Sequence, residues 1–288
     1  MPQKKTPKQI LSKLRPRKSR PNRHDLHQTI GILQLEKGQL EADVRDRDAI
    51  LRSKRSFLAN NYISGQGIEI GAAQMPVKLP AKAKARYVDV FSAEDLKKAL
   101  PLYEKLDIVH VDVVDDGEKL TKFKDNSLDF IIANHFIEHC IDPIGTVINM
   151  YKKLKREGVL YVGIPDKRYT FDIDRPLTTY EHLLEEHKDK TNNKFKAAHT
   201  LEYVKVKLGK DKNSPEKVKK RVQEILDSGY RIHYHVWTQR EMTEMFARLA
   251  KDFKLDLEIE ALLKNHHEVV YVLRKMPAHK PIDYTPEM

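Results

Sequence analysis

The sequence predicts an α/β protein with an open, mostly parallel sheet, a helix before the sheet and a helical insertion within it. Two observations support this fold class. Gly67-Ile68-Glu69-Ile70-Gly71 is an apolar segment that runs into glycine and small residues, as the first strand of such a sheet does. Further apolar runs end in acidic or polar residues, at 86–90, 108–114, 130–134 and 159–164. Because strands of this kind end at one sheet edge, we expect a ligand pocket there.

The composition limits the class of protein. With 288 residues and 40% hydrophobic content, the chain can form one α/β domain with appendages. The single cysteine, Cys140, excludes an internal disulfide and a cysteine-rich metal site and indicates a reducing compartment. Apolar runs long enough to cross a membrane and a signal-peptide core are both missing, so we expect a cytoplasmic protein. The net charge of +11 indicates anionic partners.

Residues 1–24 are predicted to form a basic, disordered tail. The first 23 residues contain nine lysines and arginines, no acid, and four prolines that interrupt any helix. Such a tail is either simply solvated or an electrostatic anchor on an anionic membrane surface. No aromatic residue is interleaved with the charges, which makes nucleic acid the less favoured partner.

Residues 25–60 are predicted to form an amphipathic helix with a short stretch that resembles a coiled coil. Leu26, Leu33 and Leu40 recur every seven residues. Two interpretations remain open, a helix packed on its own domain and a helix at residues 25–58 that pairs with a second copy. The rest of the chain, residues 61–288, is predicted to be the main domain.

Further elements of the main domain follow from local signals. Asp142-Pro143 marks the start of a helix, and Thr238-Gln239-Arg240-Glu241 is a capping box that opens another. Two closing strands are expected at 255–263 and 268–274. The basic stretch at about 167–230 is longer than a normal crossover, and it is predicted to be a helical insertion, either a substrate-binding lid or a decoration.

The order of these segments resembles the class I S-adenosylmethionine-dependent methyltransferases. The likeness covers about residues 67–164 and resumes at 235–275. It rests on the segment 67–71, on Asp89 after the second strand, on Asp116-Gly117-Glu118-Lys119-Leu120, and on residues 125–132 followed by Asn134-His135-Phe136-Ile137-Glu138-His139. The resemblance implies a Rossmann-like sheet of the class I methyltransferase type, S-adenosylmethionine as the cofactor and methyl transfer as the activity.

The chain departs from the family's pattern in the first crossover. The usual Gly-x-Gly-x-Gly is Gly71-Ala72-Ala73 here, and the short segment up to Tyr87 contains Pro76 and Pro80. We therefore expect the first helix to be stunted or replaced by a loop. Residues 165–172 resemble a branch of the family associated with bacterial surface-glycan synthesis, which implies a sugar or glycan hydroxyl as the acceptor.

The resemblance also implies roles for individual residues. Its six cofactor-binding positions are Glu69 and Gly71 beside the methionine moiety, Asp89 at the ribose hydroxyls, Asp115 and Asp116 near the adenine, and Asn134 beneath the methyl group. The base that takes the acceptor's proton is expected among four residues at or after strand ends, His135, Asp166, His233 and His235, of which we select His135, Asp166 and His235. We assign no metal ligand from the sequence.

Two other classes of function are weighed against methyl transfer. His135-Phe136-Ile137-Glu138-His139 is a literal His-x-x-Glu-His zinc-hydrolase pattern, but it directly follows a strand and already fits the methyltransferase signature. A non-catalytic scaffold would follow if the altered glycine turn no longer bound the cofactor.

Overall fold

The computed structural model describes residues 23–99, 104–189, 193–209 and 214–277. It divides into two compact units, Met1–Ala49 and Ile50–Met288, which are described separately. The predicted basic tail lies outside the described residues up to position 22. In the described part of the chain, no helix combines the length and the apolar character needed to cross a membrane.

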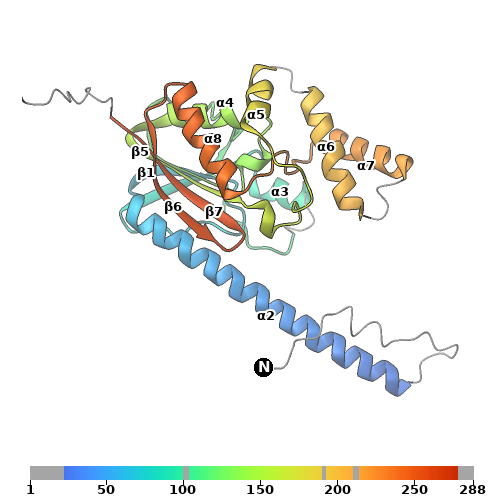
Figure 1. The fold of residues 1–288 in the computed structure, drawn as a ribbon. Helices are drawn as coiled ribbons and strands as arrows, with labels where there is room; N and C mark the ends of the chain where they lie inside the picture. Colours follow the sequence, from blue (N-terminus) through green and yellow to red (C-terminus); the bar gives the residue numbers. More distant parts are fainter. Residues whose placement is uncertain (1–22, 100–103, 190–192, 210–213, 278–288) are drawn as a thin grey trace, which may run out of the picture. The chain divides into compact units, whose positions relative to one another are not determined.

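The second unit is built on a seven-stranded sheet, shown in Figure 1. The strand order is β3-β2-β1-β4-β5-β7-β6, in which β7 runs antiparallel between β5 and β6 and the other neighbours are parallel. This order confirms the predicted Rossmann-like sheet of the class I methyltransferase type. The strands are β1 (Gly65–Ile70), β2 (Ala83–Asp89), β3 (Val113–Val114), β4 (Leu128–Asn134), β5 (Leu154–Pro165), β6 (Leu257–Asn265) and β7 (Glu268–Lys275).

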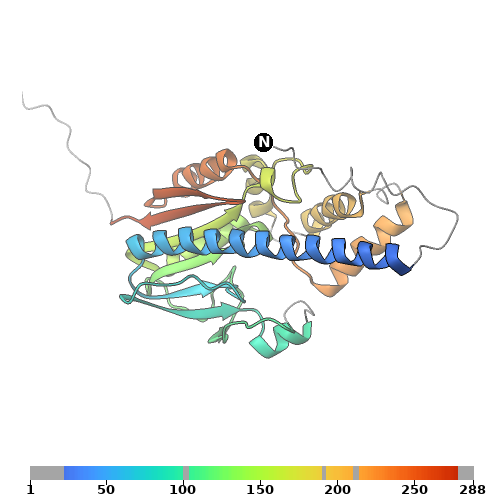
Figure 2. The same ribbon diagram turned by 90° about the horizontal axis from the view of Figure 1, so that it is seen from below.

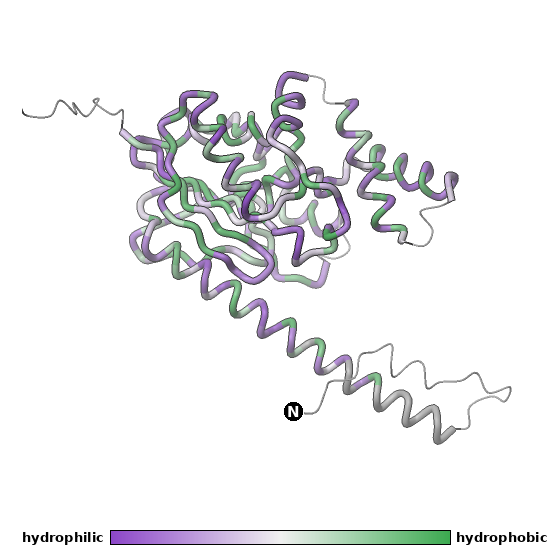
Figure 3. Tube along the Cα trace, viewed as in Figure 1, coloured by the Kyte–Doolittle hydropathy of each residue, from purple (hydrophilic) through white to green (hydrophobic). Residues whose placement is uncertain are grey.

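Both faces of the central strands are buried, because alternate side chains face opposite sides of a sheet. In β4, Ile131 and Ala133 belong to the core covered by α4 (Pro143–Lys153), α5 (Tyr180–Lys188) and α8 (Gln239–Asp252). Phe130 and Ile132 belong to the core of the other face. Figure 3 shows hydrophobic residues running along these strands, as this two-sided burial requires.

The starts of two covering helices confirm the predicted caps. The Asp142 carboxylate accepts a hydrogen bond from the Gly145 backbone N–H at 2.8 Å, and Pro143 occupies the first helical position of α4. Thr238 and Glu241 form the predicted capping box of α8.

The predicted N-terminal helix is present as α2 (Arg23–Tyr62). Its last turns belong to the second unit, where Leu58 and Ala59 share a core with Phe130 and Ile132. Figure 2 shows the C-terminal end of α2 beside the strands of the sheet. Within the first unit, the side chains of Leu33 and Leu40 are exposed. The C-terminal part of the helix therefore packs on its own domain, whereas a coiled coil at the N-terminal part stays a prediction.

Within the described part of the insertion, the α-helices are α5, α6 (Asn193–Leu208) and α7 (Pro215–Ser228), and no helix was predicted at the position of α6. α6 and α7 pack on one another through a small core of their own that includes Val204, Val218 and Ile225. Ile232 and Tyr234 join this core after α7, so the chain returns to the sheet edge along the insertion.

Two expectations about the first half of the domain need comment. The strand predicted at 108–114 is wrong for most of its length, since only Val113–Val114 pair with β2 and His110 and Asp112 interrupt the apolar run. A helix that was not predicted, α3 (Ala93–Ala99), follows β2. The predicted loss of the first crossover helix is confirmed, because a loop joins β1 to β2.

Candidate functional site

The carboxyl ends of three neighbouring strands bring predicted residues to one sheet edge. Gly71 directly follows β1, Asp89 is the last residue of β2, and Asn134 is the last residue of β4. They lie side by side, because neighbouring strands are about 4.8 Å apart. β1 and β4 flank the point where the strand order reverses, which is where open α/β sheets bind ligands. The register that sets this edge pairs Ile70 with Val88 and with Ala133.

The backbone at Gly71 is open to a ligand. Its φ is +63°, a conformation that favours glycine, and a Cβ built there would meet no atom within 4 Å. Ala73 also has a positive φ of 45°, so the second alanine of the altered motif keeps the turn without a glycine. The turn is retained although the family's glycines are replaced.

Glu69 lies two residues before Gly71 and fixes the loop that follows the turn. Both carboxylate oxygens lie 3.1 Å from the backbone nitrogen of Val77, and the side chain is buried. Burial raises the pKa of Glu69 to about 7, against the hydrogen bond from Val77 and the charge of Arg55. The structure gives Glu69 a role in positioning the loop, and its contact with the cofactor stays a prediction.

Asp89 ends β2 and is half-buried. One carboxylate oxygen accepts a hydrogen bond from the Val90 backbone N–H at 2.7 Å. Burial raises the pKa of Asp89, opposed by backbone hydrogen bonds from Val90 and Phe91. A carboxylate held at a strand end in this way is suited to accept hydrogen bonds from ribose hydroxyls.

The two acids after β3 organise their own turn. Asp115 accepts hydrogen bonds at 2.9 Å from the backbone of Asp116, the Thr121 hydroxyl and the backbone of Lys122. Asp116 accepts one from the Glu118 backbone at 3.0 Å. These bonds give both acids a structural role, and their predicted place near the adenine remains untested.

Asn134 carries the clearest sign of a missing partner. Neither its amide nitrogen nor its amide oxygen makes a hydrogen bond with any residue that the structure describes, although both atoms are buried. Gly163 on β5 makes room for this amide, since a Cβ there would lie 2.5 Å from the Asn134 oxygen. Buried polar groups are normally satisfied, so the orphaned amide fits a ligand that supplies both a donor and an acceptor.

His135 follows Asn134 and is held by a buried acid from the other end of the domain. Its Nε2 atom lies 2.8 Å from Oε2 of Glu268, and its side chain is 31% exposed. His135 has a φ of 50°, so the backbone leaves the extended strand conformation at this residue. The imidazole is therefore both oriented from behind and accessible from solvent.

Glu268 was not among the predicted site residues. Burial would raise its pKa, but the hydrogen bonds from His135 and Arg55 prevail and lower it to about 2. Arg55 donates to both oxygens, at 2.9 and 2.6 Å, and Asn265 donates to one at 2.6 Å. The sequence signal was an acid at the start of a mostly apolar strand, because its charged partners His135 and Arg55 come from distant segments.

The two other predicted bases are engaged elsewhere. The buried Asp166 carboxylate accepts hydrogen bonds from the Arg168 backbone at 3.0 Å and side chain at 2.6 Å, which outweigh burial and lower its pKa. His235 is 1% exposed, and its Nε2 lies 3.1 Å from the Cys140 carbonyl oxygen. Because neither side chain presents a free face, the structure favours structural roles, and their catalytic roles stay untested predictions.

The zinc-hydrolase interpretation lacks its structural element. Residues Ile137–His139 form one turn of 3₁₀ helix, so His135 and His139 do not share a helix face. His135 is bonded to Glu268, whereas Nδ1 of His139 lies 2.8 Å from the Ile232 carbonyl oxygen. Trp237, two residues after His235, is buried in the main core.

Comparison with known proteins now adds to this geometry. Residues 68–162 match the family model described as a methyltransferase domain. The match indicates that residues 68–162 form a methyltransferase domain. The matched segment, about a third of the chain, runs from β1 into β5 and includes Gly71, Asp89, Asn134 and His135, whereas Glu268 lies outside it. A comparison with curated protein sequences found no match.

Solved methyltransferase structures are similar to this chain at low identity. The CurJ carbon methyltransferase has 11% identity and a TM-score of 0.38, and the alignment covers 75% of this chain and 50% of that one. A possible histamine N-methyltransferase from Thermotoga maritima has 16% identity and a TM-score of 0.40, with coverages of 82% and 97%. The complex of the Haloferax volcanii Trm112 activator with a putative methyltransferase has 12% identity and a TM-score of 0.45. The alignment covers 83% of this chain and 94% of that one.

Proposed function

We propose that this methyltransferase methylates a hydroxyl group of a sugar or glycan and that His135 is the base. The observation that supports the proposal is the hydrogen bond between His135 and the buried Glu268, next to the orphaned amide of Asn134. An imidazole backed by a carboxylate is suited to take a proton from a weak nucleophile near neutral pH.

In this proposal, separate residues bind the cofactor and remove the proton of the acceptor. Gly71, Asp89 and Asn134 would hold the cofactor, which supplies a methyl group on a positively charged sulfur. Methyl transfer is a displacement, so the site must align the acceptor oxygen with that methyl group. His135 would accept the hydroxyl proton, and Glu268 would keep the ring oriented and stabilise the imidazolium that forms, as a carboxylate does behind a catalytic histidine.

The start of the insertion supports a ring-shaped acceptor. Phe171 is 44% exposed and its ring centroid lies 4.9 Å from that of His233, and Tyr169 nearby is 49% exposed. Exposed aromatic faces beside polar groups are a common feature of small-molecule sites. The resemblance of residues 165–172 to glycan-associated methyltransferases supports the same acceptor class.

We further propose a location and an assembly state from the N-terminal part of the chain. The nine basic residues in the first 23 would attract the protein to the anionic inner face of a membrane from the cytoplasm. The exposed Leu33 and Leu40 of α2 would pair with a second copy of the helix. A membrane-bound glycan precursor would then be within reach of the site.

Two measurements test the proposed function. Calorimetric titration with S-adenosylmethionine should show binding that Asp89→Ala weakens at least about tenfold, while the exposed Asp107→Ala leaves it unchanged. Formation of S-adenosylhomocysteine should then be measured with free sugars, sugar nucleotides, amines and peptides as acceptors. Turnover with amines or peptides alone would contradict the proposed acceptor class, and a folded protein without cofactor binding would contradict the cofactor site.

A further inference from the structure

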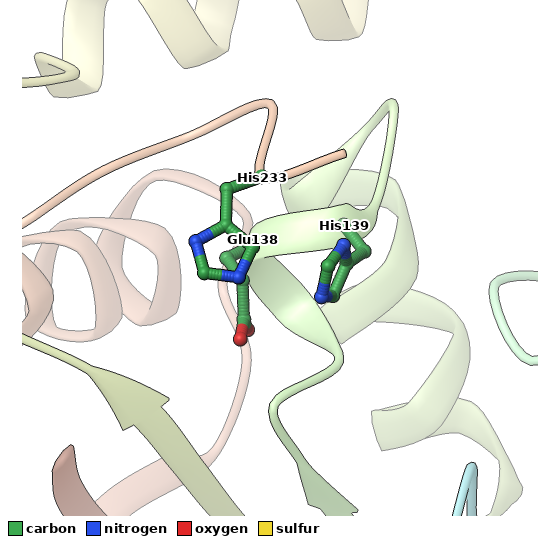
Figure 4. Close-up of side chains that lie close together, drawn as sticks. All are labelled: Glu138, His139 and His233. Carbon is green, nitrogen blue, oxygen red and sulfur yellow. The ribbon is translucent and has the colours of Figure 1, made fainter. Parts of the chain in front are cut away.

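A second group of functional side chains lies beside His135, at the turn that follows β4. Glu138 and His139 come from this turn, and His233 comes from the segment that returns from the insertion. One nitrogen or carboxylate oxygen from each of the three lies within 4.8 Å of the others. Figure 4 shows the three side chains converging from the two segments.

The two imidazoles are held in the way that metal-ligating histidines are held. Nδ1 of His139 lies 2.8 Å from the Ile232 carbonyl oxygen, which only accepts hydrogen bonds, so Nδ1 carries the proton. Nδ1 of His233 lies 2.6 Å from a carboxylate oxygen of Asp172. Both rings therefore keep the Nε2 lone pair for another partner, with the second nitrogen fixed by a carbonyl or a carboxylate.

The support behind His233 is itself fixed. Asp172 accepts a hydrogen bond at 2.9 Å from the buried Arg175, which also donates to the backbone oxygens of His233 and Tyr234. These bonds fix the position of the segment that carries His233 as well as the orientation of its ring. The proximity of the three side chains is therefore supported by a hydrogen-bond network around His233.

Glu138 supplies a negative charge, which the two imidazoles cannot provide for a bound cation. Its side chain is 1% exposed, and neither carboxylate oxygen accepts a hydrogen bond from another residue that the structure describes. A buried carboxylate without donors needs a proton or a cation.

We propose that Glu138, His139 and His233 bind a divalent transition-metal ion such as zinc, with coordination positions left over for water or for an acceptor oxygen. Two imidazoles and one carboxylate form the donor set of several catalytic zinc sites and of the non-haem iron triad. This set differs from the His-x-x-Glu-His motif, because His233 replaces His135, and His135 remains bonded to Glu268.

The metal would lie next to the proposed base. Nδ1 of His135 is 3.7 Å from a carboxylate oxygen of Glu138, so an ion bound to Glu138 would lie close to His135. A metal there would polarise an acceptor hydroxyl and make its proton easier to remove. Metal binding itself does not depend on the proposed function and is tested separately.

The chain offers an internal control. Among the described residues, one other group has ligand-type atoms this close, His182, Glu186 and His199. There both imidazoles contact the carboxylate directly, with Nε2 of His182 and of His199 at 3.1 and 2.6 Å from the same Glu186 oxygen. Those contacts use the nitrogens that a metal would need, so we expect no ion at that group.

The experiment is a zinc titration of the chelator-treated full-length protein, with bound metal measured by elemental analysis after desalting. We expect about one zinc ion per chain, and a weakening of at least about tenfold in both Glu138→Gln and His233→Ala. Asp172→Asn should weaken binding about 10- to 100-fold, because it removes the support of one ligand. His199→Ala and the exposed His110→Ala should bind zinc as the wild type does.

Several outcomes would overturn the proposal. They are absence of zinc binding in the folded wild type, unchanged binding in both Glu138→Gln and His233→Ala, and loss of binding in His199→Ala. Circular dichroism of each variant guards against unfolding, and the near-isosteric Glu138→Gln keeps the test decisive if His233→Ala does not fold. Zinc should also raise the unfolding temperature of the wild type and leave that of Glu138→Gln unchanged.

Discussion

Nε2 of His135, at the end of β4, lies 2.8 Å from Oε2 of Glu268, the first residue of β7. Arg55 of α2 donates to both oxygens of the same carboxylate. Three segments far apart in the sequence thus meet at one buried charge. The N-terminal helix thereby becomes part of the support of the candidate active site, because its arginine fixes the acid that orients the histidine.

The first prediction concerns the base. His135→Gln should lower the turnover number about 10²- to 10⁴-fold, the usual contribution of general acid–base catalysis, and leave the affinity for S-adenosylmethionine unchanged. The exposed His266→Gln, also in a turn at this side of the sheet, is the matched control. Equal turnover in His135→Gln and the wild type would exclude His135 as the base.

The second prediction concerns stability and pH. The pKa of Glu268 is about 2 in the folded protein against 4.5 as its ordinary value, because His135 and Arg55 overcome burial. A lowered pKa gives stability that is complete above 4.5 and disappears as the pH falls towards 2. Glu268→Gln should therefore destabilise the protein by about 3–5 kcal/mol at neutral pH, where it leaves Arg55 buried without its partner.

Urea unfolding of both proteins over this pH range measures the effect. The difference in unfolding free energy between wild type and Glu268→Gln should shrink as the pH falls. Glu260→Gln, which breaks the surface pair with Arg274, should change stability by less than about 1 kcal/mol. A difference that stays constant with pH would show that the Glu268 charge does not stabilise the fold.

The third prediction separates binding from stability at Asn134. The amide has no partner among the described residues, so Asn134→Leu should leave the free energy of unfolding unchanged or raise it by about 1–3 kcal/mol. The same substitution should weaken S-adenosylmethionine binding in calorimetry. A variant that is clearly less stable and binds the cofactor normally would assign Asn134 to the core instead.

The fourth prediction concerns self-association through α2. Leu33 and Leu40 are 58% and 65% exposed and stand seven residues apart, which is a coiled-coil spacing. Light scattering should give a dimer or larger assembly for the wild type and a monomer for Leu33→Glu/Leu40→Glu. The control is Gln34→Glu, an exposed change off this stripe. A monomeric wild type would refute the proposal.

The fifth prediction concerns the basic tail. Each lysine or arginine near an anionic surface contributes about 1 kcal/mol, so deletion of residues 1–22 should abolish sedimentation with vesicles that contain anionic lipid. Neutral vesicles should bind neither form, and added salt should weaken binding of the full chain. Vesicle binding that is independent of lipid charge would contradict an electrostatic anchor.

Much of the fold was predictable because it depends on local patterns. The run of residues 130–133 is apolar throughout, as a strand buried on both faces requires, and Asp142-Pro143 caps its helix through a neighbour three residues away. The prediction of a strand at 108–114 was wrong for residues 108–112. Whether these residues pair with a neighbouring strand depends on tertiary contacts, which the apolar pattern does not encode. The helix α6 was missed for a similar reason, since its burial depends on α7, on the returning segment and on α5, where Glu186 contacts His199.

For the site, the sequence determined the order of the strands' polar ends, and with it the places of Gly71, Asp89, Asn134 and His135 at one edge. Only the tertiary structure decided which of the candidate histidines is free to act. His135 is accessible because Glu268 and Arg55 hold it from behind, whereas His235 is enclosed by the insertion. The tertiary structure alone also brings His139 and His233 together. Hydrogen bonds between residues far apart in the chain fix the function of a side chain, and sequence spacing carries no information about them.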